Sequence, residues 1–316
     1  MLIVTNGQAG LDAIAATGVV GDRLAWNDVL HDGPVPPGSL EDATPTRAAF
    51  IGSWGGPGED VVLRGFRTRD ERLRRALRDG ETIVLWFEHD LYDQLQLLQV
   101  GAAVNGEPAL TSAVELVQMQ DYISLTDVET LARGYVDRRR LDHSHLGRLN
   151  RAWDAFTSPT PEALVEWTRP DPDFVCLPAA ITRLLEELPW ERSGLSRTES
   201  QILRAIERNP ISPWELFRAV QTFEPAIFMG DASFWQVLLR LAAGRPRALT
   251  LECGVPNRNA ALPEGRVSLT AEGHASLAGD LDWQRATTTE RWLGGTRLVP
   301  GPAWRWVPRD GRVLFA

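Results

Sequence analysis

The sequence predicts an α/β protein: a mostly parallel, three-layer sheet domain, followed by a helical connector and a winged-helix-like domain. Three observations predict this architecture. Strand-like and helix-like segments alternate over residues 1–120, residues 126–189 read as helices only, and residues 193–281 read as three helices, two strands and a further helix. Alternating strands and helices imply right-handed crossovers and a parallel sheet that helices cover on both faces.

Hydrophobic spacing and turn residues predict the elements of the front region, residues 1–125. In order, we expect strand 2–5, helix 11–17, strand 23–27, helices 44–53 and 59–79, strand 82–87, helix 90–99 and strand 113–117. Small residues at 6–10 form the first turn, and Gly33-Pro34 begins a loop. The strand over 82–87 is apolar throughout, which is typical of a central strand in a parallel sheet.

The middle region, residues 126–192, is expected to be a helical connector with helices near 126–133, 142–156, 161–168 and 178–187. The back region, residues 193–281, begins with Ser196, which should cap a helix with Glu199 at the third helical position. Helices 212–221 and 231–243 follow, and then strands 248–253 and 266–269. The tail, residues 282–316, contains four tryptophans, so we expect it to pack on the body.

Composition excludes several classes of protein. The chain has no lysine, so it is neither a P-loop nucleotide-binding protein nor a pyridoxal phosphate enzyme, which both need one. No apolar run approaches the roughly 20 residues that span a bilayer, and the first residues lack a signal-peptide pattern. We therefore expect a cytoplasmic protein with no membrane partner. Cys176 and Cys253 lie too far apart in the sequence to indicate a disulfide framework or a thiolate zinc site.

Charge is distributed unevenly along the chain. The net charge is −9, yet residues 193–316 carry 15 Arg against 12 Asp and Glu, whereas residues 1–192 carry 18 Arg against 30. Phosphate neutralisation supplies most non-specific affinity for nucleic acid, so the acidic front region does not favour duplex binding. We expect at most weak binding of nucleic acid, through the back region.

A first polar cluster follows the strand over 82–87. Glu88, His89 and Asp90 come directly after it, and Asp93 and Gln94 lie in the first turn of the next helix. Ligands of open parallel sheets bind beyond the carboxyl ends of the strands, which is where these side chains should lie. The alternative for Asp90 and Asp93 is purely structural, with Asp90 as a helix N-cap and Asp93 as its reciprocal acid.

A second polar cluster follows the strand over 23–27. It contains Asn27, Asp28, His31 and Asp32 and ends at Gly33. Asp28 is expected either to orient His31 for acid–base work or to bind a divalent ion with it. The alternative is a loop histidine bonded to an aspartate beside a turn.

A third candidate element is the turn after the first strand. Asn6 and Gly7 lie there, where backbone N–H groups at a helix N-terminus can hold an anion. Because parallel strands end on the same side of a sheet, all three polar segments should meet at one edge.

No close metal-ligand motif appears in the sequence. Asp142-His143-Ser144-His145 superficially resembles a metal pair, but residues two apart on a helix point in different directions, so we interpret it as a helix cap with surface histidines. We therefore predict no metal centre, and no cofactor can be named from these residues.

Several motifs resemble those of a known bacterial family. The segments are 5–7, 26–36, 86–95, 228–235 and 291–295, and together they are similar to the family called domain of unknown function 1835. The resemblance extends over nearly the whole chain. It implies a shared site at the polar segments without naming a reaction.

Two functions fit these observations. In the first, the front region binds a small polar or phosphorylated metabolite, and His31 or His89 moves a proton in hydrolysis or group transfer, oriented by Asp28, Glu88 or Asp90. In the second, the protein is a ligand-sensing regulator or adaptor whose back region meets DNA, a protein partner or a second copy of the chain. The third back helix offers only Gln236 and Arg240 as base-reading groups.

Overall fold

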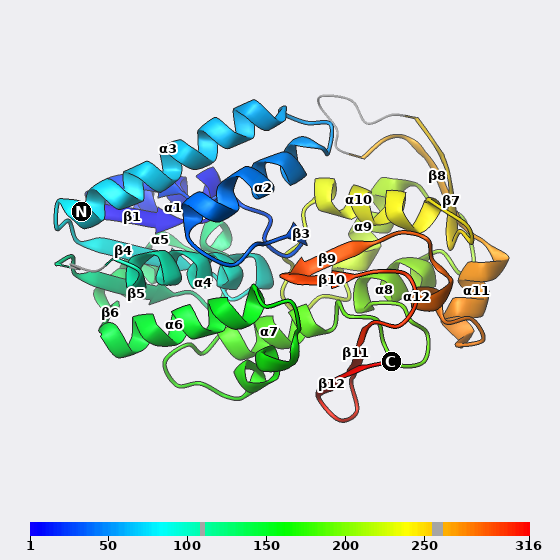
Figure 1. The fold of residues 1–316 in the computed structure, drawn as a ribbon. Coiled ribbons are helices and arrows are strands. Elements are labelled where there is room, and N and C mark those ends of the chain that lie inside the picture. Colours follow the sequence, from blue (N-terminus) through cyan, green and yellow to red (C-terminus); the bar gives the residue numbers. More distant parts are fainter. Residues whose placement is uncertain (108–110, 255–261) are drawn as a thin grey trace.

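The computed structural model describes residues 1–107, 111–254 and 262–316 (Figure 1). The front region contains a five-stranded sheet in the order β2-β1-β4-β5-β6. Its strands are β1 (Leu2–Thr5), β2 (Asp22–Ala25), β4 (Ile83–Phe87), β5 (Val114–Gln118) and β6 (Arg139–Leu141). All neighbouring pairs are parallel except β5–β6, which confirms the α/β class with a mostly parallel sheet.

Side chains alternate between the two faces of the sheet, and helices cover both. On one face, Ile3, Val84 and Trp86 pack with α1 (Gly7–Ala16) and α5 (Val128–Val136). On the other face, Leu85 and Phe87 join a larger core with helices of the front and middle regions. These helices are α3 (Glu59–Arg78), α4 (Leu91–Asn105), α6 (His143–Phe156) and α7 (Leu177–Leu185). Helix α2 (Leu40–Gly52) lies along α3.

The middle region is helical, as expected; the 3-10 helix η1 (Ile123–Leu125) precedes α5, and the 3-10 helix η2 (Glu162–Thr168) lies between α6 and α7. Strand β6 was not expected. Its residues Arg139 and Arg140 give no apolar alternation, and the strand forms because it adds to the edge of the sheet beside β5.

The back region contains the expected helices and strands. They are α8 (Arg197–Ala205), α9 (Pro213–Gln221), α10 (Asp231–Ala242), β7 (Leu249–Cys253), β8 (Gly265–Leu269) and α11 (Ala271–Ala278). Ser196 and Glu199 form the predicted capping box of α8. These elements enclose a core of their own, centred on Leu203, Phe234 and Leu238.

The tail packs on the rest of the molecule, as its tryptophans indicated. It forms α12 (Trp283–Ala286), β9 (Arg291–Gly294), β10 (Thr296–Leu298), β11 (Trp304–Val307) and β12 (Arg312–Phe315). In Figure 1, β9 and β10 lie between the front region and the back helices. Strand β9 pairs in parallel with a two-residue strand of the front region, β3 (Gly33–Pro34). The tail therefore completes a sheet that begins in the front region.

No helix in the described ranges is both long and apolar enough to cross a membrane.

A close approach of two backbones fixes the tail against α6. The Gly295 N–H donates to the Phe156 carbonyl at 3.0 Å. A Cβ atom on Gly295 would lie only 1.9 Å from the Thr157 carbonyl oxygen. Only glycine permits this contact, because any side chain would force the backbones apart.

We expect Gly295→Ala to destabilise the protein by about 2 kcal/mol or more, because overpacking against backbone cannot be relieved by a rotamer change. Urea unfolding measures the effect. Gly65→Ala is the matched control, since Gly65 lies in α3 and a Cβ atom added there would meet no atom within 4 Å. That control should be neutral or slightly stabilising. Equal stability of both variants would show that the tail does not depend on this contact.

Candidate functional site

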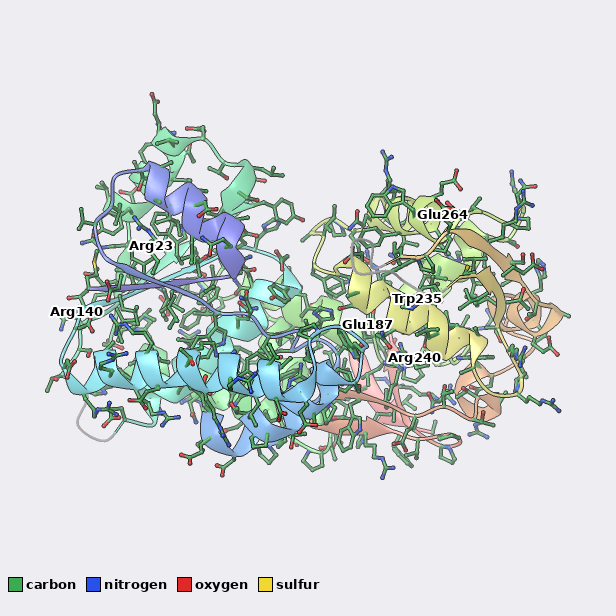
Figure 2. The ribbon with its side chains drawn as sticks, turned by 90° about the horizontal axis from the view of Figure 1, so that it is seen from above. Arg23, Arg140, Glu187, Trp235, Arg240 and Glu264 are labelled. Carbon is green, nitrogen blue, oxygen red and sulfur yellow. The ribbon has the colours of Figure 1, made fainter. Side chains whose placement is uncertain are left out.

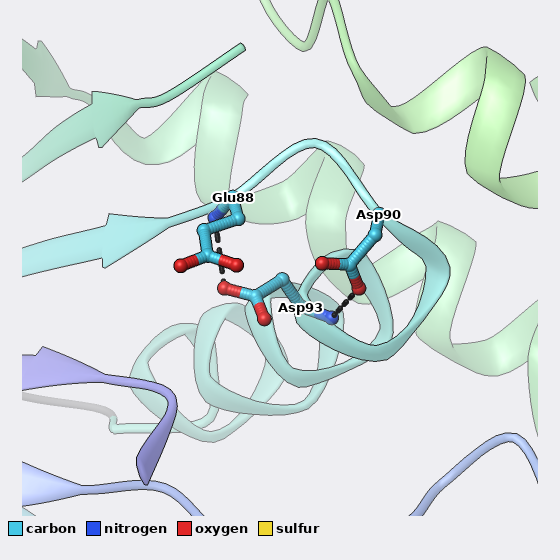
Figure 3. Close-up of side chains that lie close together, drawn as sticks. All are labelled: Glu88, Asp90 and Asp93. Carbon is cyan, nitrogen blue, oxygen red and sulfur yellow. Dashed lines mark hydrogen bonds between the residues drawn. The ribbon is translucent and has the colours of Figure 1, made fainter. Parts of the chain in front are cut away.

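The carboxyl end of β4 leads directly into a group of three acidic side chains (Figure 3). Glu88 is the first residue after β4, Asp90 is the N-cap of α4, and Asp93 lies in the first turn of α4. The Asp90 carboxylate accepts a hydrogen bond from the Asp93 N–H at 3.1 Å, which confirms the predicted cap. Asp93, however, accepts from the Glu88 N–H at 2.8 Å and thereby closes the turn that joins β4 to α4.

The three carboxylates are buried and close together. One oxygen from each lies within 4.8 Å of the others, and the residues are 5%, 3% and 0% exposed in the order Glu88, Asp90, Asp93. Their other partners are neutral: the Ile123 N–H donates to Glu88 at 2.7 Å, and the Asn6 side-chain amide donates to Asp93. No arginine forms an ion pair with them in the part of the chain that the structure describes. The negative charge of this acidic cluster is therefore not compensated.

Burial changes the acidity of all three groups. It raises the pKa of Glu88 to about 7, and the charge of Asp90 adds to this effect. Burial also raises the pKa of Asp90 to about 6. The pKa of Asp93 is raised well above its usual value by burial and then by the charges of Asp90 and Glu88. Such closely spaced carboxyls titrate as a coupled set, so the cluster retains protons near neutral pH.

This arrangement supports two kinds of chemistry. Carboxyl groups that titrate near neutrality can act as general acid and general base in one reaction. Carboxylate oxygens at this spacing are also the ligands that Mg²⁺, Ca²⁺ and Mn²⁺ prefer. The residues therefore fit a hard divalent cation, although the sequence contains no recognisable metal motif.

The ends of β1 and β4 meet at this place, as expected for parallel strands. Asn6 precedes α1, but its side chain bonds Asp93 instead of capping its own helix. Gly7 has a φ of +53°, which favours glycine. The Gln94 amide donates to the Glu88 carbonyl at 2.5 Å and so supports the same turn. Asn6, Gly7, Glu88, Asp90, Asp93 and Gln94 therefore belong to one structural unit.

Asp28 has a different partner from the one expected. It forms a buried ion pair with Arg47 of α2, with 2.7 Å between Asp28 Oδ1 and Arg47 Nη2, and makes no hydrogen bond with His31. Arg47 also donates to the carbonyls of Val29 and Asp32, at 2.9 and 2.7 Å. Asp28 therefore neutralises the arginine that organises the loop after β2. Asn27 is exposed beside it.

The two predicted histidines are both neutral at pH 7 but differ in their surroundings. His31 packs edge-on against Phe228, with 5.0 Å between ring centroids, and neither of its ring nitrogens has a hydrogen-bond partner within the described ranges. Burial lowers the pKa of His31 to about 3, so its ring is neutral. His89 is half-buried against the ring of Tyr122, and burial lowers its pKa as well. The groups that titrate near neutrality are Glu88 and Asp90.

Tyr122 and Ile123 form a further part of this site that the sequence did not predict. Ile123 of η1 supplies a backbone donor to Glu88, and Tyr122 contacts both His89 and the backbone of Ile227. The Ile123 donor is a backbone N–H, which no side-chain pattern in residues 120–125 indicates, so only a structure could reveal this contact. Thr5 is fully buried at the end of β1, and its hydroxyl has no partner among the described residues.

The remaining candidate residues lie outside the acidic cluster. Asp142 caps α6 and accepts from the His145 N–H at 3.0 Å, while His143 is exposed, as predicted. Gly33 lies in β3 with a φ of +76°, against the ring of Phe50. Cys176 and Cys253 are both free, Cys176 being buried and Cys253 half-buried.

Comparison of the chain with protein-family models gives no match, and comparison with curated proteins gives none either. The resemblance to the family of domain of unknown function 1835 stays a prediction.

The raised pKa values predict that stability falls as the pH rises through neutrality. In the folded state Glu88 and Asp90 bind protons more tightly than carboxyls of the unfolded chain, whose pKa is about 4. Their contribution to the free energy of unfolding is therefore complete below about pH 4 and is lost as the pH rises through about 7. Glu88→Gln removes one of these groups. At pH 8 we expect the variant to exceed the wild type in free energy of unfolding by about 1–3 kcal/mol.

Urea unfolding at pH 5 and pH 8 measures this difference, which should be larger at pH 8. His31 has the opposite effect on the pH dependence, because its lowered pKa reduces stability as the pH falls below 6.5. This effect cancels in the comparison, because both the wild type and Glu88→Gln contain His31. Glu129→Gln, on the exposed side of α5, is the matched control and should leave the pH dependence of the wild type unchanged. A wild-type pH profile retained by Glu88→Gln would contradict the assignment.

Proposed function

We propose that the protein is an enzyme that acts on a small polar molecule at the carboxyl end of β4. Glu88 and Asp90 share a proton and serve as general acid and general base in hydrolysis or group transfer. The observation that carries this proposal is the group of three mutually close, buried carboxylates with raised pKa values, for which the described residues offer no cationic partner.

Capping of α4 accounts for only one of the three carboxylates. One N-cap oxygen satisfies the donor at the start of α4, and Asp90 supplies it. Burying further carboxylates without a cation is unfavourable, and natural structures usually pair them. Residues whose acidity is strongly perturbed in this way concentrate at functional sites.

The charge of the cluster limits the class of substrate. Uncompensated carboxylates favour a neutral polar or a cationic molecule, because a phosphate group placed directly against them would be repelled. A phosphorylated metabolite remains compatible only with a divalent cation bridging the carboxylates and the phosphate. The half-buried, neutral His89 offers a hydrogen bond to the ligand beside the acids.

The first test is a titration that needs no substrate. Carboxyl carbon NMR should show that Glu88 and Asp90 titrate between about pH 5 and 8, as a coupled pair. Added Mg²⁺ or Mn²⁺ should lower these pKa values if a cation belongs to the site. Titration of both groups near pH 4 without a cation would remove the basis of the proposal.

The second test measures turnover in a screen of ester, amide, glycoside and phosphoester substrates. Both Glu88→Gln and Asp90→Asn should lower kcat by a factor of about 100 or more, since acid–base catalysis contributes at least that much. The pH profile of kcat/KM should be bell-shaped around neutrality. Glu129→Gln is the control with unchanged turnover. Full activity in both site variants would refute the proposed roles.

A specific observation favours regulation as a second candidate function. Helices α8, α9 and α10 are followed by the β7–β8 hairpin, and an isolated bridge joins Ile211 to Val267 of β8. Three helices with a small sheet of this connectivity are typical of a winged helix. In a winged helix that binds DNA, the outer face of α10 would contact the bases. Here that face is directed toward the front region: Gln236 and Arg240 line a cavity together with Phe50 and Trp54, at the end of α2.

We therefore expect only weak, sequence-independent binding of duplex DNA at physiological salt. The exposed Arg245 and Arg247 lie before β7 and could contact phosphates, while Arg258 lies outside the described residues. A mobility-shift assay measures this affinity, and replacing Arg245 and Arg247 with Gln should reduce it further. Recovery of a defined site at nanomolar affinity would make regulation the first candidate.

A further inference from the structure

A cavity lies between the front region, α10 and the tail. Its volume is about 540 Å³, which is within the usual range for small-molecule sites. It contains none of the three acidic side chains at the end of β4. Its wall comes from the loop at β3, the end of α2, the outer face of α10 and the start of β9.

Three aromatic side chains surround this cavity. Phe50 and Trp54 are in edge-to-face contact, with 5.4 Å between ring centroids, and Trp292 of β9 lines the same space. All three are only partly buried. Gly33 packs directly against the ring of Phe50, since a Cβ atom at Gly33 would lie 2.3 Å from that ring. Phe50 is thus held against Trp54, while part of the surface of each ring stays open to a ligand.

Two arginines in the cavity wall share one distant carboxylate partner, Glu199. The Nε atoms of Arg240 and Arg291 lie 3.8 and 4.0 Å from the same Glu199 oxygen, which is too far for a hydrogen bond. Arg240 makes no hydrogen bond within the described ranges, and its Nε is buried without a partner. Arg291 donates to the Glu187 carbonyl. Figure 2 shows Arg240 and Glu187 at the junction between the two halves of the molecule.

The acidic groups near this cavity are already engaged. Glu290 pairs with Arg297 at 2.6 Å, and the Asp32 carboxylate accepts from the Gly33 N–H at 2.8 Å. Glu199 accepts from the Ser196 N–H at 2.9 Å, as part of the α8 capping box. The other Glu199 oxygen, Oε1, lies within 4.0 Å of both Arg240 and Arg291 and forms an ion pair with each, without a hydrogen bond. A bound anion would supply a closer hydrogen-bond acceptor for the two guanidinium groups.

We propose that this cavity binds a small planar aromatic anion between Phe50, Trp54 and Trp292, with its anionic group on Arg240 and Arg291. Guanidinium groups bind carboxylates and phosphates through paired, charge-assisted hydrogen bonds. Aromatic side chains bind planar rings by stacking or edge contacts. A mononucleotide and an aromatic carboxylate share this chemistry. Because both the front region and α10 line the cavity, the ligand would join them.

Isothermal titration calorimetry with the full-length protein tests the proposal. Adenosine monophosphate and indole-3-acetate each carry a planar ring and an anionic group, and they represent the two sources. At least one should bind with a dissociation constant below about 1 mM. Adenosine, which lacks the anion, and inorganic phosphate, which lacks the ring, should each bind at least about tenfold more weakly.

Two variants locate the binding. Arg240→Gln should weaken the affinity about tenfold or more, because a charge-assisted hydrogen bond is lost. Trp54→Ala should weaken it as well, through loss of a ring contact that does not depend on charge. Arg204→Gln is the matched control, since Arg204 is exposed on α8 and lines no part of this cavity. Glu88→Gln should bind like the wild type, which separates this site from the proposed catalytic one.

Three results would overturn the proposal. One is the absence of saturable binding of both aromatic anions. Another is binding of inorganic phosphate as tight as that of adenosine monophosphate, which would leave the rings without a role. The last is unchanged affinity in folded Arg240→Gln and Trp54→Ala, which would place the ligand elsewhere.

Discussion

The side chain of Asp93 connects the three segments on which the acidic cluster depends. One of its oxygens accepts from the Glu88 N–H at the end of β4, and the other accepts from the Asn6 side chain at the end of β1. Its own N–H donates to Asp90. Two strands and the first turn of α4 are thus held together by one fully buried group, which fixes the positions of Glu88 and Asp90 before any ligand arrives.

The two polar segments of the front region contain similar residues but have different electrostatics. Asp28 is neutralised by Arg47 in a pair that is nearly inaccessible to water, and this pair organises a loop. Among the described residues, the acids at the end of β4 have only neutral hydrogen-bond donors, and burial raises their pKa values. Residue type alone does not distinguish an ion-paired carboxylate from one with a raised pKa. The distinction depends on whether tertiary structure brings a guanidinium group within reach.

Local pattern predicts most of the secondary structure and part of the site. The apolar run before Glu88 predicts β4, and the Asp90 cap follows from the residues around it. The pairing of β3 with β9 could not be predicted, because two residues such as Gly33-Pro34 carry no periodicity. The sequence also could not show whether the histidines or the carboxyl groups titrate near neutral pH. The low pKa of His31 results from burial near Phe228, which lies almost 200 positions further along the chain.

The pairing of β3 with β9 has a consequence for how the chain folds during synthesis. Gly33 is synthesised well before its strand partner Leu293, which lies 260 positions further along the chain. Until then, the loop after β2 lacks the backbone hydrogen bond that Val35 donates to Gly294. Pairing between strands so far apart in the sequence is slow, and the loop after β2 stays exposed until β9 pairs with β3. The loop after β2 therefore acquires its full set of backbone hydrogen bonds only after the tail has been synthesised.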